Sequence, residues 1–267
     1  MSTIARTARD TTVVARRNLI KIKRVPDLLV FTLLSPIMFV LLFAYVFGSA
    51  IPIEGVNYRE YLMGGIFAQT VVFGATITGA GLAEDMQKGI IDRFRSLPMS
   101  RSAVLAGRTA SDVVNNILVL IVMSVTGLAI GWRINTHPLR ALVGFVILLL
   151  FAYAVSWMMA YIGLLVPSPE VVNNASFIAI FPLTFIANTF VPTDNFPTVL
   201  RTFADWNPVS AVALAARQAF GNLPEGFPIA DVWALQNPEL YTVLWVVLIM
   251  AIFVPLSSRQ YQRAAQR

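Results

Sequence analysis

Residues 141–165 read ALVGFVILLLFAYAVSWMMAYIGLL, a run of 25 residues without Asp, Glu, Lys or Arg. About 20 apolar residues in a helix cross the hydrocarbon core of a bilayer, so this run predicts a membrane-spanning helix. The whole chain has the same character, because 57% of its 267 residues are hydrophobic and only 13% are charged. Soluble domains carry about 25% charged residues. The sequence therefore predicts an all-α integral membrane protein.

Five further uncharged runs bring the predicted transmembrane helices to six, at about residues 28–48, 61–83, 113–131, 141–165, 171–191 and 240–257. All 34 charged residues fall outside these runs. Such a separation is expected in a bilayer, because a charge at its centre costs at least about 3 kcal/mol. We interpret residues 28–267 as a single six-span membrane domain that follows a cytoplasmic segment at residues 1–27.

The positive charges predict the orientation. Fifteen of the 20 Lys and Arg residues lie in residues 1–27, in the connector 84–112 and after Ser257, and five lie in the connectors on the other side. Because cytoplasmic loops carry the excess of Lys and Arg, we expect both termini in the cytoplasm. We expect a multi-pass protein of the inner or plasma membrane of a bacterium.

Several classes of protein are disfavoured by what the sequence lacks. The net charge of +6 is explained by basic ends of a membrane protein, so no nucleic-acid partner is expected. Cysteine is absent and His137 is the only histidine, so no metal site is expected. The sequence has no G-x-x-x-x-G-K-[ST] loop for ATP and no nucleophile–base pattern, so we expect no catalytic residue and no bound cofactor.

Residues 4–24 have the pattern of an amphipathic helix. At about 100° per residue one apolar stripe forms, and the basic residues lie outside it; the stripe comprises Ile4, Ala8, Thr11, Ala15, Leu19 and Ile22. Such a helix lies in the membrane interface with its cations toward headgroups and water. The pattern leaves open whether this helix only anchors the chain or also contacts a cytoplasmic partner.

The connector 84–108 reads EDMQKGIIDRFRSLPMSRSAVLAGR, which is longer than two neighbouring spans require. It combines an apolar surface (Ile90, Ile91, Phe94, Leu97) with a charged one (Lys88, Arg93, Arg95), and Pro98 ends its predicted helix. A short helix of this kind suits docking in a cleft of another protein. The alternative is a solvated connector that rests on headgroups.

Residues 192–239 form a predicted external loop with helical periodicity at 198–204 and 209–220. The Asn207-Pro208 pair favours a helix start, and Gly221 favours a helix end. Because backbone at membrane depth must satisfy its own hydrogen bonds, we predict short re-entrant helices here.

A cavity for an amphipathic molecule is suggested by aromatic residues in the second and fifth predicted spans. Phe177, Phe181 and Phe185 recur every four residues and share one helix face. Phe67, Phe73 and Gln69 of the second span could complete an aromatic pocket with one polar contact. The alternative is that these rings face lipid or pack against neighbouring helices.

Two stretches resemble a known family. The acid, the glycine and the Leu-Pro-x-Ser-Arg sequence after the second span resemble the coupling segment of ABC type-2 exporter permeases. The matching residues are Glu84, Gly89, Arg93, Leu97, Pro98, Ser100 and Arg101. Residues 182–220 resemble the daunorubicin/doxorubicin-resistance permease branch of that family through Pro182, Leu183, Phe185, Phe190, Val191, Pro192, Phe196, Pro197, Leu200, Phe203, Ala204, Asn207, Pro208, Val209 and Arg217. Asn188 departs from the pattern, which has a small residue there.

The resemblance implies a membrane subunit of an ABC exporter of hydrophobic or amphipathic compounds, such as a drug, an antibiotic or a lipid. It implies that residues 84–101 dock on a separate ATPase that binds ATP and Mg²⁺, and that the permease pairs with an identical or homologous chain. The implied coupling residues are Glu84, Gly89, Arg93, Phe94, Leu97, Pro98 and Arg101. The predicted substrate pathway comprises Phe67, Gln69, Phe73, Phe177, Phe181, Phe185 and Asn188. Three alternatives remain: an ABC exporter of polysaccharide or glycolipid, a secondary carrier driven by an ion gradient, and an assembly or sensor membrane protein that transports nothing.

Overall fold

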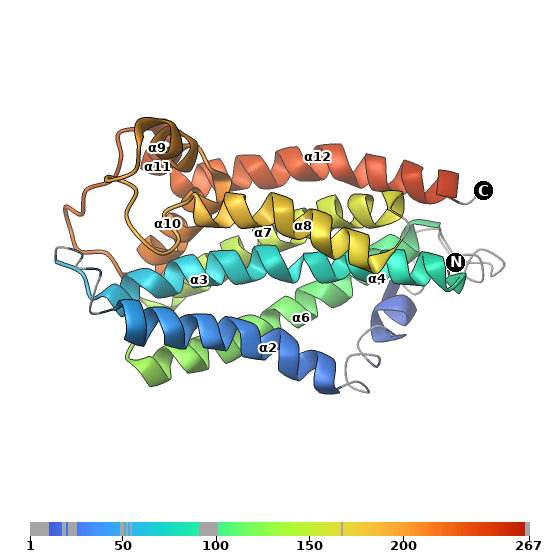
Figure 1. The fold of residues 1–267 in the computed structure, drawn as a ribbon, viewed down its shortest axis with the longest axis horizontal. Coiled ribbons are helices and arrows are strands. Elements are labelled where there is room, and N and C mark those ends of the chain that lie inside the picture. The colour runs from blue at the N-terminus through green and yellow to red at the C-terminus, as the bar shows by residue number, and fades with distance from the viewer. Residues whose placement is uncertain are drawn as a thin grey trace.

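The computed structural model describes residues 11–17, 20, 26–48, 51, 53, 55–90, 101–166 and 168–264, with the backbone alone at 26–32, 101–104 and 264. Across these ranges the secondary structure is helical and contains no strand. The longer helices run side by side along one axis and form an elongated bundle (Figure 1). The expected all-α fold class is therefore confirmed.

The first half of the chain forms α2 (Pro26–Leu41) with its continuation, the π-helix η1 (Leu42–Phe47), then α3 (Tyr58–Gly74), α4 (Thr76–Gln87) and α6 (Arg101–Ile130). The second half forms α7 (Pro138–Leu165), α8 (Pro169–Phe185), α9 (Thr198–Asp205), α10 (Pro208–Phe220), α11 (Trp233–Gln236) and α12 (Pro238–Ala264). The helices α3 and α4 are nearly continuous, because only Ala75 separates them.

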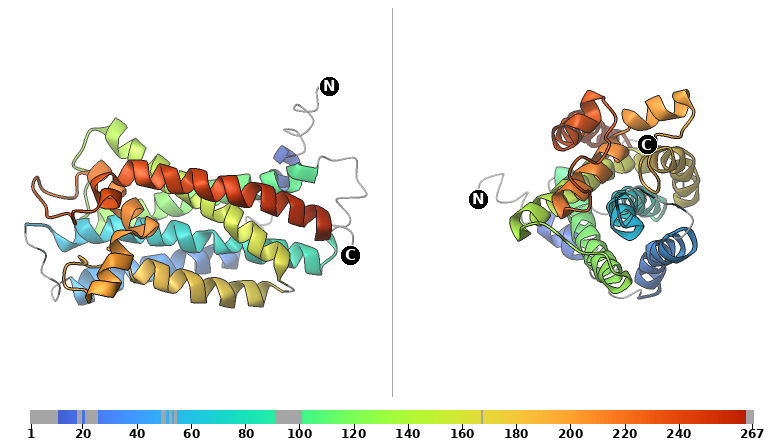
Figure 2. Two further views of the ribbon diagram at one scale, coloured as in Figure 1. Left: turned by 90° about the horizontal axis from the view of Figure 1, so that it is seen from above. Right: turned by 90° about the vertical axis from the view of Figure 1, so that its left-hand side faces the viewer.

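The two ends of the bundle carry different parts of the chain. The short helices α9, α10 and α11 lie at one end, on the left of Figure 1. The helix at residues 11–17, the end of α4, the start of α6 and the end of α12 lie at the other (Figures 1 and 2). We refer to these as the loop end and the terminal end of the bundle.

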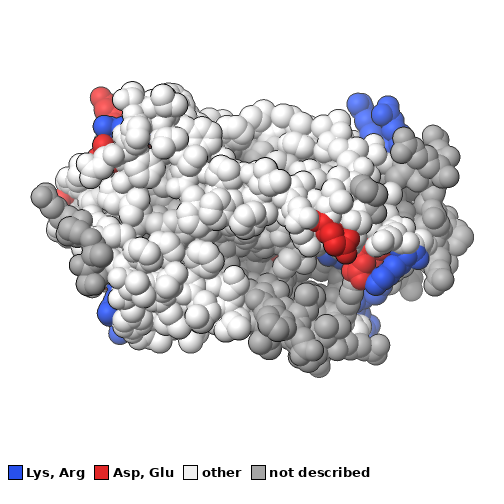
Figure 3. All heavy atoms as spheres, in the orientation of Figure 1, with Lys and Arg blue, Asp and Glu red and all other residues white. Residues whose placement is uncertain are grey.

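Within the described part of the chain, four helices are long and apolar enough to cross a membrane: Tyr58–Gln87, Leu105–Ile130, Pro138–Leu165 and Pro238–Arg263. On the face drawn in Figure 3, the charged side chains gather at the two ends and the broad middle of the bundle carries none. This distribution is the one that burial in hydrocarbon requires.

Local sequence explains where several helices begin. The side chains of Asn57, Ser168 and Asn207 accept hydrogen bonds from backbone N–H groups in the first turns of α3, α8 and α10. Proline follows directly after Ser168 and Asn207, where its missing N–H costs nothing. Gly221 ends α10 in the left-handed conformation at φ 68°, as the sequence predicts.

The centre of the bundle is α7, which packs against α12, α4, α10, α6 and α3. Its contact with α4 depends on glycine, because a Cβ on Gly163 would lie 2.2 Å from the carbonyl oxygen of Gly79. Small residues allow helix backbones to approach this closely in a membrane protein. The uncharged, small-residue composition of the second predicted span therefore serves packing against α7.

Several helix boundaries differ from the predicted spans, among them the start of α6 and the end of α8. The third span was predicted to begin at residue 113, but α6 already begins at Arg101 and includes the buried residues Arg108 and Asp112. The fifth was predicted to reach residue 191, but α8 ends at Phe185. At 1.5 Å per residue its 17 residues reach about 25 Å. The cause is tertiary, because side chains from α10 and its cap bind the carbonyl groups that follow α8.

Candidate functional site

A cavity of about 460 Å³ lies between α2, α3, α4, α6 and α8. The helices α3 and α4 contribute Ile66, Gln69, Thr70, Phe73, Gly74, Thr76 and Ile77, and α8 contributes Phe177, Phe181 and Phe185. The remaining wall consists of Ser35, Pro36 and Phe39 of α2 and Val119 of α6. None of the described lining residues is charged, so the cavity suits an apolar or amphipathic molecule.

The α8 wall is a ladder of phenylalanine rings. The ring centroids of Phe177 and Phe181 are 5.1 Å apart, and those of Phe181 and Phe185 are 4.1 Å apart with nearly parallel planes. Phe73 of α3 faces the ladder, with its centroid 6.4 Å from that of Phe177. Aromatic faces at these spacings can stack with a flat apolar guest.

The polar groups of the cavity are few. Thr76 is already engaged, because its hydroxyl donates to the carbonyl oxygen of Phe73 at 2.7 Å. Gln69 is 5% exposed, and no hydrogen bond joins its amide to another described residue. That amide can therefore offer one donor group and one acceptor to a molecule in the cavity.

Further aromatic rings continue from the lining residues Phe39 and Phe185. Phe190, which follows α8, lies 5.0 Å from Phe185 and stacks on Phe43 of η1 at 4.3 Å between centroids. Phe43 in turn lies 6.1 Å from Phe39 and 5.0 Å from Phe47. This contribution from α2 and η1 was not predicted, although Phe39, Phe43 and Phe47 repeat at the same four-residue spacing as the α8 ladder.

Of the predicted pathway residues, the structure brings Gln69, Phe73, Phe177, Phe181 and Phe185 together at this cavity. Phe67 lies elsewhere, fully buried among the rings of Trp132, Phe145 and Phe220. The reason is helical geometry, because residues six apart are rotated by roughly 120° around the axis, so Phe67 and Phe73 face different neighbours.

Asn188 also lies outside the cavity, in a network around Arg217 of α10. The fully buried guanidinium of Arg217 donates to the carbonyl oxygens of Tyr61, Asn188 and Thr189 at 2.7–2.9 Å and to Asn188 Oδ1 at 3.2 Å. Asn207 adds hydrogen bonds to the carbonyl oxygens of Leu183 and Ile186. These contacts satisfy the backbone where α8 ends, which the sequence pattern could not indicate.

The predicted coupling segment begins on α4 at the terminal end of the bundle. Glu84 accepts a hydrogen bond from Lys88, and this contact raises the pKa of Lys88 above its usual value. Gly89 ends the turn at φ 64°, a left-handed conformation that favours glycine. Arg101 is the first residue of α6. The predicted positions Arg93, Phe94, Leu97 and Pro98 lie outside the described residues.

Comparison with known proteins decides the family. The sequence profile of the ABC-2 type transporter family matches residues 9–220. The chain belongs to the ABC-2 type transporter family. The match includes α2 through α10, and so every helix that lines the cavity of this ABC-2 permease.

Two relatives agree with this assignment. The "Daunorubicin resistance ABC transporter permease protein DrrB1" of Streptomyces coeruleorubidus is 32% identical over 247 residues, 92% of this chain and 83% of the relative. A protein of Cyanophora paradoxa named as transport permease ycf38 is 25% identical over 203 residues, 74% of this chain and 69% of that protein. The predicted resemblance to ABC type-2 permeases and to their daunorubicin-resistance branch is thereby confirmed.

Proposed function

We propose that this ABC-2 permease is the membrane subunit of an ATP-driven exporter of hydrophobic or amphipathic compounds. The observation that carries the proposal is the cavity between α2, α3, α4, α6 and α8, whose volume of about 460 Å³ and uncharged lining suit a drug-sized apolar molecule. The daunorubicin-resistance name of the relative DrrB1 points to the same class of cargo.

The lining of the cavity argues against a polysaccharide as the cargo. A polysaccharide presents many hydroxyl groups, each of which costs free energy when it is desolvated without a hydrogen-bond partner. The lining offers an unengaged amide at Gln69 and small hydroxyl groups, against a wall of phenylalanine rings. A lipid or a drug with one polar group matches this lining better, and the glycolipid alternative is tested below by direct comparison.

The energy source is a separate ATPase subunit that binds ATP and Mg²⁺. Residues 84–101 at the terminal end are the proposed contact, with Glu84, Gly89, Arg93, Phe94, Leu97, Pro98 and Arg101 as the coupling residues. ATP binding closes the ATPase subunits, pushes on this segment and shifts a permease pair from inward-open to outward-open. The second permease is an identical or a homologous chain.

The proposed topology has six spans with the terminal end in the cytoplasm of a bacterial cell. The helices α2 and η1 together, at Pro26–Phe47, supply the first span, and α8 with its non-helical continuation supplies the fifth. The helices α9, α10 and α11 then lie outside, with α10 held against α3 through Arg217. The asymmetric distribution of Lys and Arg supports this orientation.

The partner is tested by affinity purification of the chain from its native host in mild detergent, followed by mass spectrometry. A stoichiometric ABC-type ATPase is the expected result, and a second permease in the same peak would distinguish a heterodimer from a homodimer. A chain that purifies without an ATPase even after crosslinking would favour the ion-gradient carrier and would make residues 84–101 an ordinary connector.

A further inference from the structure

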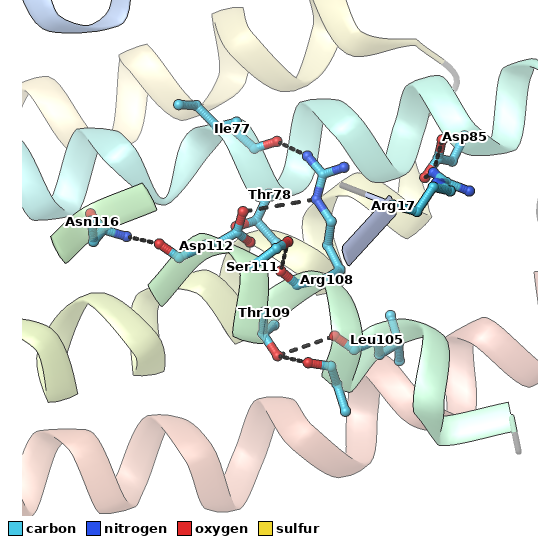
Figure 4. Close-up of polar contacts among 11 residues, drawn as sticks. Arg17, Ile77, Thr78, Asp85, Leu105, Arg108, Thr109, Ser111, Asp112 and Asn116 are labelled. Atoms are coloured by element: carbon cyan, nitrogen blue, oxygen red, sulfur yellow. Dashed lines mark hydrogen bonds and ion pairs between the residues drawn. The ribbon is translucent and has the colours of Figure 1, made fainter. Parts of the chain in front are cut away.

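A buried polar cluster joins α4 to α6 near the terminal end of the bundle (Figure 4). Arg108 and Asp112 of α6 are 8% and 6% exposed, and Thr78 of α4 is fully buried. Neither the cavity nor the Arg217 network uses these residues. They lie on the two helices that flank the proposed coupling segment, since α4 ends at Gln87 and α6 begins at Arg101.

Side chains of α6 form hydrogen bonds with two consecutive residues of α4, Ile77 and Thr78. Arg108 Nη2 donates to the carbonyl oxygen of Ile77 at 2.9 Å, and the hydroxyl of Thr78 donates to Asp112 Oδ2. Within α6, Arg108 Nε lies 3.9 Å from Asp112 Oδ1 as an ion pair. A Cβ on Gly81 would lie 1.9 Å from Arg108 Nη2, so the glycine makes room for the guanidinium against the α4 backbone.

These hydrogen bonds between α4 and α6 lie next to the cavity. Thr76 and Ile77, at the start of α4, line the cavity, and the Ile77 carbonyl is itself the acceptor for Arg108. Any displacement of α6 near Arg108 therefore acts on the cavity wall through a hydrogen bond to a lining residue.

A second contact bridges the same two helices closer to their ends. Arg17 of the helix at 11–17 forms an ion pair with Asp85 of α4 at 3.0 Å. The same helix lies against α6, where a Cβ on Gly107 would lie 2.7 Å from Val14 Cβ. The start of α6, the end of α4 and the 11–17 helix are thus tied together beside the coupling segment.

Stability alone does not explain a buried ion pair at this place. A buried pair often contributes no more than well-packed apolar residues of the same volume. Among the described residues, Arg108 Nε has no hydrogen-bond partner, and neither has Oδ1 of the neighbouring Asn116. An arrangement that fixes the relative position of two helices accounts for this choice of residues better than one that maximises stability.

We propose that Arg108, Asp112 and Thr78 are positioning residues that make α4 and α6 move as one lever, so that a push on the coupling segment reaches the cavity wall at Ile77. The inference rests on the proposed exporter function. Loss of the cluster uncouples the permease from the ATPase subunit, so that less cargo is moved for each ATP hydrolysed.

The test compares Thr78→Val with Thr78→Ser in the complex with the ATPase, reconstituted in proteoliposomes. Valine keeps the shape and removes the hydroxyl, whereas serine keeps the hydroxyl that donates to Asp112. For Thr78→Val we expect unchanged expression and ATP hydrolysis and a fall of about tenfold in cargo moved per ATP, as for loss of a hydrogen bond to a charged group. Thr78→Ser restores the native ratio, which a purely structural role for the volume of the side chain would not predict.

A second measurement does not require transport. Because the chain has no cysteine, spin labels can be placed at the exposed positions Gln87→Cys on α4 and Val114→Cys on α6 without a background. We expect one narrow distance distribution in the permease that keeps Thr78, and a broadened one with Thr78→Val. An unchanged distance distribution together with an unchanged ratio of transport to ATP hydrolysis would overturn the proposal that α4 and α6 move as one lever. If the unmodified complex moves no cargo, the proposed exporter function fails. The distance measurement alone then still tests whether Thr78 fixes α4 to α6.

Discussion

The guanidinium carbon of Arg217 lies 3.6 Å from the ring centroid of Tyr61, and the Nε of the same residue donates to the Tyr61 carbonyl oxygen at 2.7 Å. One side chain of α10 thus binds both the ring and the backbone of a residue near the start of α3. No carboxylate among the described residues forms an ion pair with Arg217, so backbone carbonyl groups and an aromatic face stabilise this buried charge. The Arg217 network holds the loop end together.

The first prediction concerns this network. Arg217→Met leaves the carbonyl oxygens of Asn188 and Thr189 buried without these partners, at about 1–3 kcal/mol for each unsatisfied group. We expect the free energy of unfolding to fall by at least about 2 kcal/mol, measured as a lower melting temperature in detergent. Arg140→Gln is the control, because its ion pair with Glu239 is partly exposed and contributes no more than about 1 kcal/mol. Equal melting temperatures for the two variants would contradict the role of Arg217.

The contact between α4 and α7 gives the second prediction. Gly163→Ala forces a methyl group against the backbone of Gly79, and neither backbone can yield without separating the helices. We expect a loss of stability of about 3 kcal/mol, at the upper end of the usual cost of overpacking. Gly127→Ala is the matched control, because its Cβ meets first the flexible methyl end of Met63. Thermal unfolding of the two variants side by side gives the comparison.

The third prediction concerns the cavity. Phe181→Ala interrupts the aromatic ladder of α8, so we expect the KM for an aromatic cargo to rise by roughly three- to tenfold, as for loss of one aromatic contact. The control is Phe203→Ala on α9, because Phe203 is half exposed and lies outside the cavity lining. Transport by the two variants at several cargo concentrations separates a change in KM from a change in maximal rate. An equal change of KM in the two variants would contradict the assignment of the cavity to the substrate pathway.

The coupling segment gives the fourth prediction. Removing Glu84 disrupts the contact with Lys88, and removing Arg93 deletes a cation from the proposed ATPase-binding surface. We expect Glu84→Ala combined with Arg93→Ala to weaken co-purification of the ATPase and to reduce export in proportion. A double variant that loses ATPase contact yet exports at the normal rate would contradict the proposed coupling.

Four of the six long uncharged runs coincide with described helices that are long and apolar enough to cross a membrane, because hydrocarbon burial depends on composition and length. The helix α6 begins before the uncharged run at 113–131, since Arg108 and Asp112 pair with each other in the interior and a charge count treats both as loop residues. The helix α8 ends before residue 191 because the carbonyl groups of Leu183, Ile186 and Asn188, in its last turn and just after it, accept hydrogen bonds from side chains that are distant in sequence. Such tertiary contacts leave no trace in local hydropathy.

Only part of the cavity could be predicted, because helical periodicity shows which residues share a face but not how the helices pack. The four-residue spacing of Phe177, Phe181 and Phe185 fixes their common face, but it does not say which helix that face meets. Helical periodicity alone already separates Phe67 from the face that holds Gln69 and Phe73. Phe39 of α2 also lines the cavity, and only the packing of the bundle brings it there.

The central claim is that this ABC-2 permease moves hydrophobic or amphipathic compounds at the expense of ATP. The most direct measurement is uptake into inside-out vesicles that contain the permease and its ATPase, with a neutral aromatic dye and a fluorescent glycolipid compared under an ATP supply and under an imposed ion gradient. The account predicts uptake of the dye that requires ATP, survives collapse of the ion gradient and falls with Phe181→Ala. Uptake that follows the ion gradient without ATP, or that is confined to the glycolipid, would contradict it.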